Sequence, residues 1–174
     1  DVVGILLLAT ITGVAGGTIR DVVLGRVPNS IVDPTYVVVT IASGIVIFFL
    51  YSHLKKHWNL FLKFDAIGLG VFTIIGATFA YNIFGLNFLA ILLAGILTAV
   101  GGGILRDVFV NQSPIVFIKE FYLSASFIGI VIFSIILYFT DEIYYATIIG
   151  IILTTSLRLI GIKYNWNLPR ARES

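Results

Sequence analysis

The sequence contains no cysteine, and only 11% of its 174 residues are charged. Without cysteine the chain can form neither a disulfide nor a thiolate metal site, and it has no thiol nucleophile. Its two histidines, His53 and His57, lie together in a basic segment, which argues against a histidine metal site. Soluble domains usually carry about 25% charged residues, so these charges are too few to keep a globule of this length wetted. We therefore expect no bound metal or cofactor. We also expect most of the protein surface to face a solvent other than water.

Apolar residues are abundant instead, at 59% of the chain with a mean hydropathy of +1.06. Crossing a bilayer takes about 20 apolar residues in a helix, and six runs are long enough. Lipid tolerates only helices or closed barrels, and the absence of period-2 alternation favours helices. The net charge of +2 is too small to indicate a nucleic-acid partner. The predicted spans are 2–21, 35–52, 65–83, 87–107, 121–139 and 143–162.

Basic residues predict the orientation of these spans. When alternate loops are placed on opposite sides, Lys and Arg divide nine against two. Loops rich in Lys and Arg face the cytoplasm, so we expect a multi-pass protein of the cell membrane with a cytoplasmic C-terminus. The poorer side holds Arg20 and Arg26, and the richer side holds Lys55, Lys56, Lys63, Arg106, Lys119, Arg158, Lys163, Arg170 and Arg172.

The sequence repeats itself at an offset of 86 residues. Residues 12–28 and 98–114 align without gaps and are identical at eight of 17 positions, including a Gly-Gly-x-x-Arg-Asp motif and a later proline. The copies lie three spans apart, so the second must run through the membrane in the opposite direction. The predicted fold is one all-α transmembrane domain, 1–174, with inverted three-plus-three helix repeats and a final helix. Its parts are 1–63, which lacks the first helix of its repeat, 64–140, and 141–174 with the cytoplasmic tail.

Each copy of the motif places glycines and an Arg-Asp pair inside an apolar span. An interior glycine weakens a helix by about 1 kcal/mol relative to alanine. The glycines therefore indicate either a helix break, whose freed carbonyls suit monovalent cations, or a close helix crossing. A charge at the bilayer centre costs roughly 2.5–3.5 kcal/mol, and the repeated pair favours a buried polar cluster over side chains that reach the interface. The candidate ion-pathway residues are Thr12, Gly16, Gly17, Arg20, Asp21, Thr98, Gly101, Gly102, Gly103, Arg106, Asp107, Ser156 and Arg158.

Some of these candidates have alternative interpretations. The hydroxyls of Thr12 and Thr98 either face a pathway or bond their own backbone. Arg158 needs an anionic or carbonyl partner, which Asp21 or Asp107 would provide. Lys119 is interpreted as a helix start at the interface or as a gate, and Asp65 is most simply a helix cap.

At the doubled motif the sequence resembles the trimeric intracellular cation (TRIC) channel family in its prokaryotic branch. Residues Asp65 to Leu69, Lys119 to Tyr122 and Arg158 to Pro169 also fit that family. The resemblance implies a seven-helix fold and a homotrimer in membrane lipid, with a pore in each subunit that conducts K⁺ and other monovalent cations. The chain departs from the family in lacking the first helix, and in having Ala15 where the second copy has Gly101.

Three classes of function fit these features. The first is a monovalent cation channel lined by two glycine-broken helices. The second is a secondary transporter of a small zwitterion such as an amino acid, because inverted repeats serve transporters as readily as channels. The third is a structural or lipid-binding membrane protein. We do not expect an enzyme, since no nucleophile–base pair, nucleotide loop or metal cluster is visible.

Overall fold

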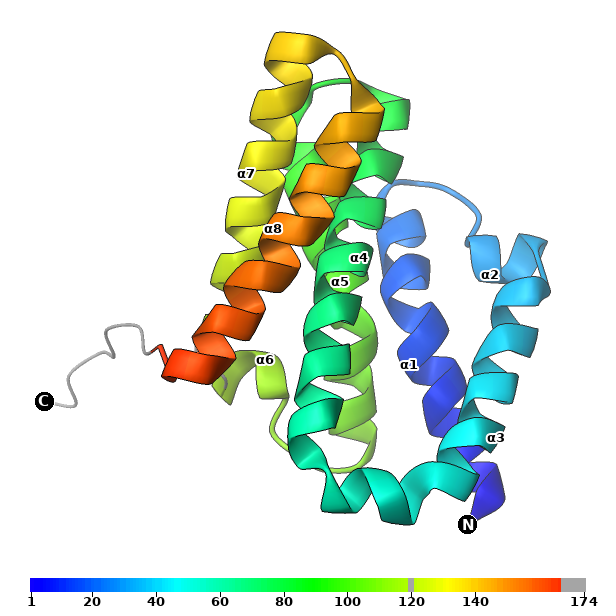
Figure 1. Cartoon of the computed structure of the whole chain (residues 1–174). Coiled ribbons are helices and arrows are strands. Elements are labelled where there is room, and N and C mark those ends of the chain that lie inside the picture. Colours follow the sequence, from blue (N-terminus) through cyan, green and yellow to red (C-terminus); the bar gives the residue numbers. More distant parts are fainter. Residues whose placement is uncertain (119–120, 167–174) are drawn as a thin grey trace, which may run out of the picture.

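The computed structural model describes residues 1–118 and 121–166, which form helices joined by short turns (Figure 1). Within these described residues, six helices are long and apolar enough to cross a membrane, which confirms the predicted spans. Two one-turn helices, α2 and α6, follow α1 and α5 and lie outside the predicted spans. The bounds are α1 Val2–Val23, α2 Asn29–Val32, α3 Thr35–Lys56, α4 Trp58–Phe84, α5 Phe88–Phe109, α6 Ile115–Ile118, α7 Tyr122–Thr140 and α8 Ile143–Tyr164.

The basic segment between α3 and α4 is helical rather than a long loop. Helix α3 continues to Lys56, and α4 begins at Trp58 rather than near residue 65. Lysine and leucine are good helix formers, and helix ends that extend beyond the hydrocarbon can carry charge. At the other end of α3, the carboxylate of Asp33 accepts the Thr35 N–H at 2.9 Å and so caps the start of the helix.

The two repeats are inverted. In Figure 1, α1 and α5 run in opposite directions, as do α3 and α7. Helices α1 and α5 each have 22 residues, and both of their ends differ by the offset of the sequence repeat. Even their first turns match, because Asp1 caps the N–H of Gly4 and Asn87 caps the N–H of Ala90. The inverted-repeat membrane fold is therefore confirmed.

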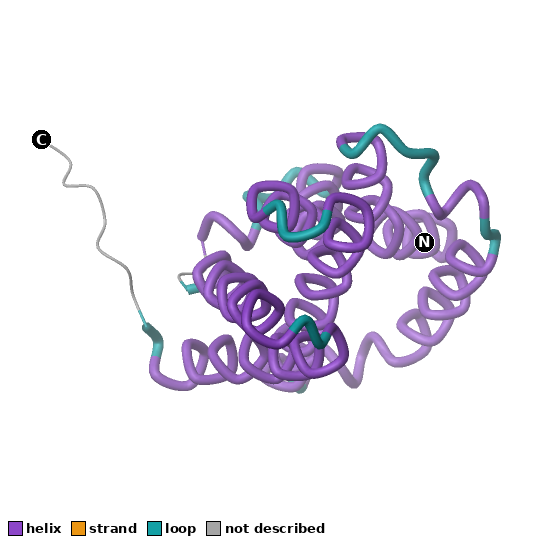
Figure 2. The backbone as a smooth tube through the Cα atoms, turned by 90° about the horizontal axis from the view of Figure 1, so that it is seen from above, coloured by secondary structure: helices purple, strands orange, loops and turns teal. Residues whose placement is uncertain are grey.

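The core lies between the second repeat and the final helix, where α4 packs against α5, α7 and α8. Ile74, Ile91, Ile130 and Phe133 are fully buried there. Helix α1 packs against α5, and α3 packs against α1 at the edge of the bundle (Figure 2). Large apolar side chains of α3 are exposed, Phe49 among them, as suits a surface that faces hydrocarbon. This arrangement makes the α1–α5 crossing the junction between the two repeats.

Candidate functional site

Helices α1 and α5 cross with their backbones in contact. A Cβ atom built on Gly16 would lie 2.5 Å from the carbonyl oxygen of Thr98, and one built on Gly102 would overlap the carbonyl oxygen of Thr12. Gly101 lies at the centre, where a Cβ would be 3.0 Å from the Cα of Gly16. The contacts are reciprocal because Thr12 and Gly16 are the repeat partners of Thr98 and Gly102. Only glycine permits this approach.

Both helices remain continuous through their glycines, from Val2 to Val23 and from Phe88 to Phe109. The predicted break at Gly16-Gly17 and at Gly101 to Gly103 is therefore wrong, and the close-crossing interpretation is correct. Tight packing of small residues outweighs their weak helix propensity in a membrane bundle. Backbone carbonyls of continuous helices are used in helical hydrogen bonds, so they are not ready cation ligands.

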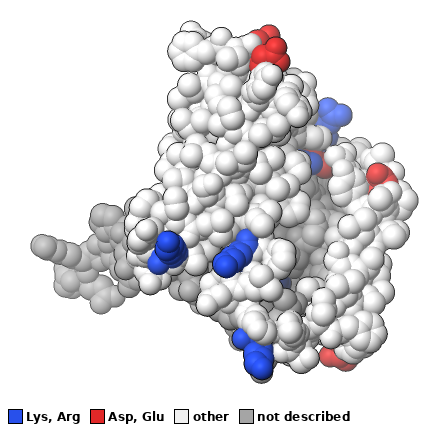
Figure 3. All heavy atoms as spheres, viewed as in Figure 1, with Lys and Arg blue, Asp and Glu red and all other residues white. Residues whose placement is uncertain are grey.

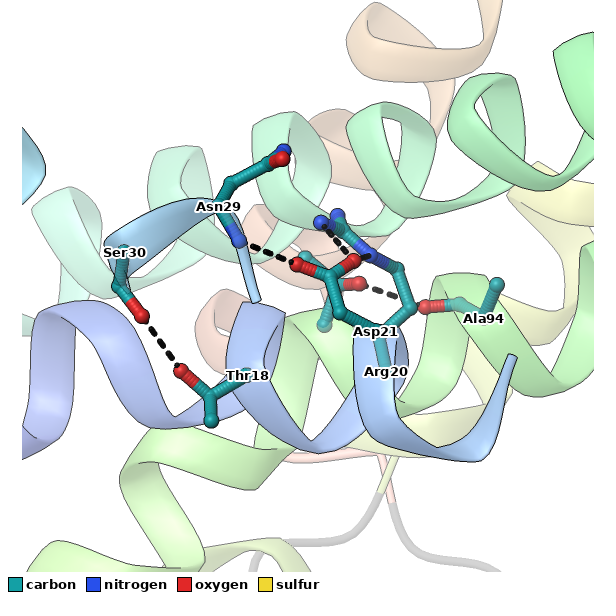
Figure 4. Close-up of polar contacts among 7 residues, drawn as sticks. Thr18, Arg20, Asp21, Asn29, Ser30 and Ala94 are labelled. Carbon is teal, nitrogen blue, oxygen red and sulfur yellow. Dashed lines mark hydrogen bonds and ion pairs between the residues drawn. The ribbon is translucent and has the colours of Figure 1, made fainter. Parts of the chain in front are cut away.

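Each Arg-Asp pair folds onto itself next to the crossing. Asp21 Oδ1 accepts hydrogen bonds from Arg20 Nε at 2.9 Å and Nη2 at 2.8 Å (Figure 4). Arg106 Nε and Nη2 both lie 2.8 Å from Asp107 Oδ1. Arg20 is only 5% exposed, whereas the Arg106 side chain is 27% exposed. The predicted buried polar cluster is present, and it is more open at the Arg106 end.

The other oxygen of each carboxylate binds a short helix. Asp21 Oδ2 accepts the N–H of Asn29, the first residue of α2, at 2.9 Å. Asp107 Oδ2 accepts the N–H of Ile115, the first residue of α6, at the same distance of 2.9 Å. This role was not predicted from the sequence, although the prolines just before both residues mark the start of each short helix.

A cavity of about 430 Å³ lies beside the crossing, lined mainly by α1, α4 and α5. Ten of the thirteen candidate pathway residues line it, while Gly101 sits in the helix contact and Ser156 and Arg158 lie on α8 outside the lining. The hydroxyls of Thr12 and Thr98 donate to the carbonyls of Leu8 and Ala94, one turn earlier in the same helices, at 2.6 and 2.7 Å. The candidates on the cavity wall are Thr12, Gly16, Gly17, Arg20, Asp21, Thr98, Gly102, Gly103, Arg106 and Asp107.

Asp65 is a cavity residue that the sequence did not reveal as one. Since α4 begins at Trp58, Asp65 lies two turns inside the helix rather than at its cap. Its carboxylate accepts a 3.4 Å hydrogen bond from the Tyr122 hydroxyl and interacts electrostatically with Arg158, whose guanidinium lies 4.7 Å from the Tyr122 ring centre. Asp65 is thus the carboxylate beside Arg158, in place of the predicted Asp21 or Asp107.

Phe79 is a second such residue, with its ring 3.9 Å from the Arg20 guanidinium. An aromatic face helps a buried cation to tolerate its site. Lys119, predicted as a gate or a helix start, lies outside the described residues. Among the described residues, no group of three or more His, Asp or Glu side chains could hold a metal ion.

Known membrane proteins are similar to this chain in sequence. A family model described as glycine transporter matches residues 1–52 and 62–139. The UPF0126 inner membrane protein YadS of Escherichia coli K12 is 35% identical over 173 residues, covering 97% of this chain and 83% of YadS. The UPF0126 membrane protein YvgT of Bacillus subtilis is 31% identical over 172 residues, with coverage of 97% and 83%.

Solved structures also match this chain over nearly its whole length. One, from work on conductance through TRIC cation channels, superposes with a TM-score of 0.90 at 32% identity, covering 100% of this chain and 86% of that one. A TRIC channel orthologue from Rhodobacter sphaeroides gives a TM-score of 0.89 at 32% identity, with coverage of 95% and 86%. The chain therefore belongs, with its UPF0126 relatives, to the family of membrane proteins that the glycine transporter model describes, and it has the TRIC channel fold that the doubled motif predicted.

Proposed function

We propose that the protein is a passive channel for K⁺ and other monovalent cations, with one pathway in each subunit of a homotrimer. The likeness to the TRIC channel structures over the whole chain carries this proposal. The pathway runs through the cavity at the α1–α5 crossing, where the inverted repeats meet. Transport sites of inverted-repeat proteins lie at this junction.

The oxygen atoms that serve the cation are those of side chains. Thr12 and Thr98 line the cavity from opposite repeats, and Asp65 adds a residue with a carboxylate. The Arg20–Asp21 and Arg106–Asp107 pairs are each neutral overall. Weak ligands of this kind allow an ion to enter and to leave, as conduction requires.

The orientation follows the charges. On the face drawn in Figure 3, most Lys and Arg side chains lie toward the end of the molecule where α3 meets α4. Helix α8 ends at the same end in Figure 1. The positive-inside tendency supports a multi-pass protein of the cell membrane whose C-terminus is cytoplasmic.

Reconstitution in planar bilayers tests the channel. We expect unitary currents under a KCl gradient. Their reversal potential should be shifted from zero toward the equilibrium potential of K⁺. Liposomes that contain the purified protein should also lose a K⁺ gradient, at a rate proportional to the amount of protein. Currents carried by chloride, or no unitary current from folded trimers, would overturn the proposal.

A second candidate is a transporter of a small zwitterion such as glycine. The cavity offers a carboxylate at Asp65 for an ammonium group and a partly exposed guanidinium at Arg106 for a carboxylate. The description of the matching family model also favours it. Saturable uptake of labelled glycine into liposomes, without unitary currents, would support this candidate over the channel.

A further inference from the structure

Helices α1 and α5 end in the same turn. The N–H of Arg26 bonds the carbonyl of Asp21, and the N–H of Gln112 bonds the carbonyl of Asp107, both at 2.8 Å. Gly25 and Asn111 occupy the left-handed region between them, with φ of 69° and 56°. Glycine and asparagine are the residues that favour this helix-ending motif. The sequence thus specifies that the chain reverses at both places.

After each reversal, a one-turn helix lies against one end of the cavity. Asn29 and Ser30 of α2 line the cavity, and so do Ile115 and Val116 of α6. Figure 1 shows α2 and α6 at opposite ends of the α1–α5 pair. We call these ends the α2 mouth and the α6 mouth. Each short helix is therefore placed to cover one mouth.

The carboxylates of Asp21 and Asp107 hold these covers. In each, one oxygen binds the preceding arginine and the other binds the first N–H of the short helix. Both oxygens of each carboxylate already accept hydrogen bonds from the protein. A carboxylate that binds a passing cation would instead need an oxygen turned toward the ion. Asp21 is 1% exposed and Asp107 is 4% exposed, so water competes little for these bonds.

We propose that Asp21 and Asp107 are positioning residues that act as two separate latches, each keeping one mouth of the cavity covered by its short helix. The inference deepens the proposed function, because it assumes that the cavity is the pathway. Opening a mouth requires the bond between the carboxylate and the short helix to break. Since the two latches share no residue, each mouth opens independently of the other.

The two latches differ in the other contacts that hold their short helices. Thr18 Oγ1 and Ser30 Oγ are hydrogen-bonded at 2.9 Å, which adds a polar tie between α1 and α2 (Figure 4). The repeat partners of these residues are Ile104 and Val116, which pack instead against an apolar cluster. The α2 cover thus has a second polar contact that can be removed without touching either aspartate.

The absence of cysteine allows a direct test. Ala99 lines the cavity, so Ala99→Cys provides the one thiol of the protein as a reporter. A membrane-impermeant thiol reagent is applied to one side of membrane vesicles at a time, in right-side-out and inside-out preparations. Asp21→Asn puts an NH₂ group, which cannot accept a hydrogen bond, in place of one carboxylate oxygen.

We expect Asp21→Asn to raise the labelling rate at least about fivefold from one side only, a change equivalent to about 1 kcal/mol in the opening equilibrium. Asp107→Asn should give the same increase from the opposite side only. Ser30→Ala, which leaves both aspartates intact, should give a smaller increase from the Asp21 side. Asp33→Asn is the matched control, since Asp33 lies at the α2 end, binds the Thr35 N–H and does not line the cavity. It should change neither rate.

Equal increases from both sides, unchanged rates with both aspartate variants, or the same increase with Asp33→Asn would overturn the latches. An altered ion selectivity with unaltered labelling would also do so, because it would make the aspartates ligands of the ion. Ser30→Ala decides the α2 side if Asp21→Asn does not fold. Labelling requires no transport, so a failure of the channel proposal in bilayers is separate from a failure of the latches.

Discussion

Replacing Gly102 with alanine is expected to destabilise the protein strongly, while the same change at the adjacent Gly103 is tolerated. A Cβ at Gly102 would overlap the Thr12 backbone carbonyl, which cannot rotate away. At Gly103 the nearest atom would be Arg106 Nη2, at 3.9 Å. Overpacking costs typically about 1–3 kcal/mol, whereas alanine in an open helix position gains about 1 kcal/mol over glycine. The two variants should therefore differ by several kcal/mol.

The first repeat supplies a matched pair for this prediction. Gly16→Ala should destabilise through the Thr98 carbonyl, and Gly17→Ala should not, because its Cβ would meet only Arg20 Nη2 at 3.7 Å. The melting temperature of all four variants is measured in detergent. The readout is the fraction of protein that stays monodisperse after heating. Equal melting temperatures for Gly102→Ala and Gly103→Ala would show that the helices do not cross with their backbones in contact.

Removing the Asp21 carboxylate is expected to have the second large effect. In Asp21→Ala the Arg20 guanidinium stays buried and loses both of its hydrogen bonds to the carboxylate, and the Asn29 N–H loses its acceptor. Breaking a buried ion pair from one side costs about 3–5 kcal/mol. Asp107→Ala should cost less, because the Arg106 side chain is 27% exposed and can be hydrated in the cavity.

A double-mutant cycle isolates the pair. If the penalty comes from the stranded guanidinium, Arg20→Ala combined with Asp21→Ala should recover part of the stability lost in Asp21→Ala alone. The melting temperature in detergent of the two single variants and the double variant gives the coupling. Additive losses, or a larger loss for Asp107→Ala than for Asp21→Ala, would contradict this account of the buried charges.

The long-range architecture was readable from the sequence because its signals are strong. Apolar runs of bilayer length specify the spans, and the repeated motif at residues 12–28 and 98–114 specifies their inversion. The start of α4 was missed because the segment before Asp65 is basic, and charge was interpreted as a loop. The same segment contains Trp58, Leu60 and Leu62, which extend an apolar pattern back by two turns.

Local geometry at the site was less accessible. A glycine run has the same appearance whether it breaks a helix or admits a neighbouring backbone, and only the position of Thr12 and Thr98 on the facing helix decides between them. The partner of each Asp oxygen was also hidden, because a backbone N–H has no sequence signature. The aligned repeat does pair Gly25 with Asn111, and both residues favour the left-handed conformation of the matching turns that bring α2 and α6 back to these carboxylates.

The central claim is that ions cross the membrane through the cavity beside the α1–α5 crossing, and filling that cavity tests it. Gly68 lines the cavity, and a Cβ there would meet no atom within 4 Å, so Gly68→Phe places a ring in the space without a backbone clash. Ile67→Phe is the control, because Ile67 is 47% exposed and does not line the cavity. In K⁺ flux from liposomes, we predict at least about a tenfold loss for Gly68→Phe, equivalent to a barrier about 1.4 kcal/mol higher, and no loss for Ile67→Phe. Folded Gly68→Phe protein that conducts like the unmodified chain would contradict the claim.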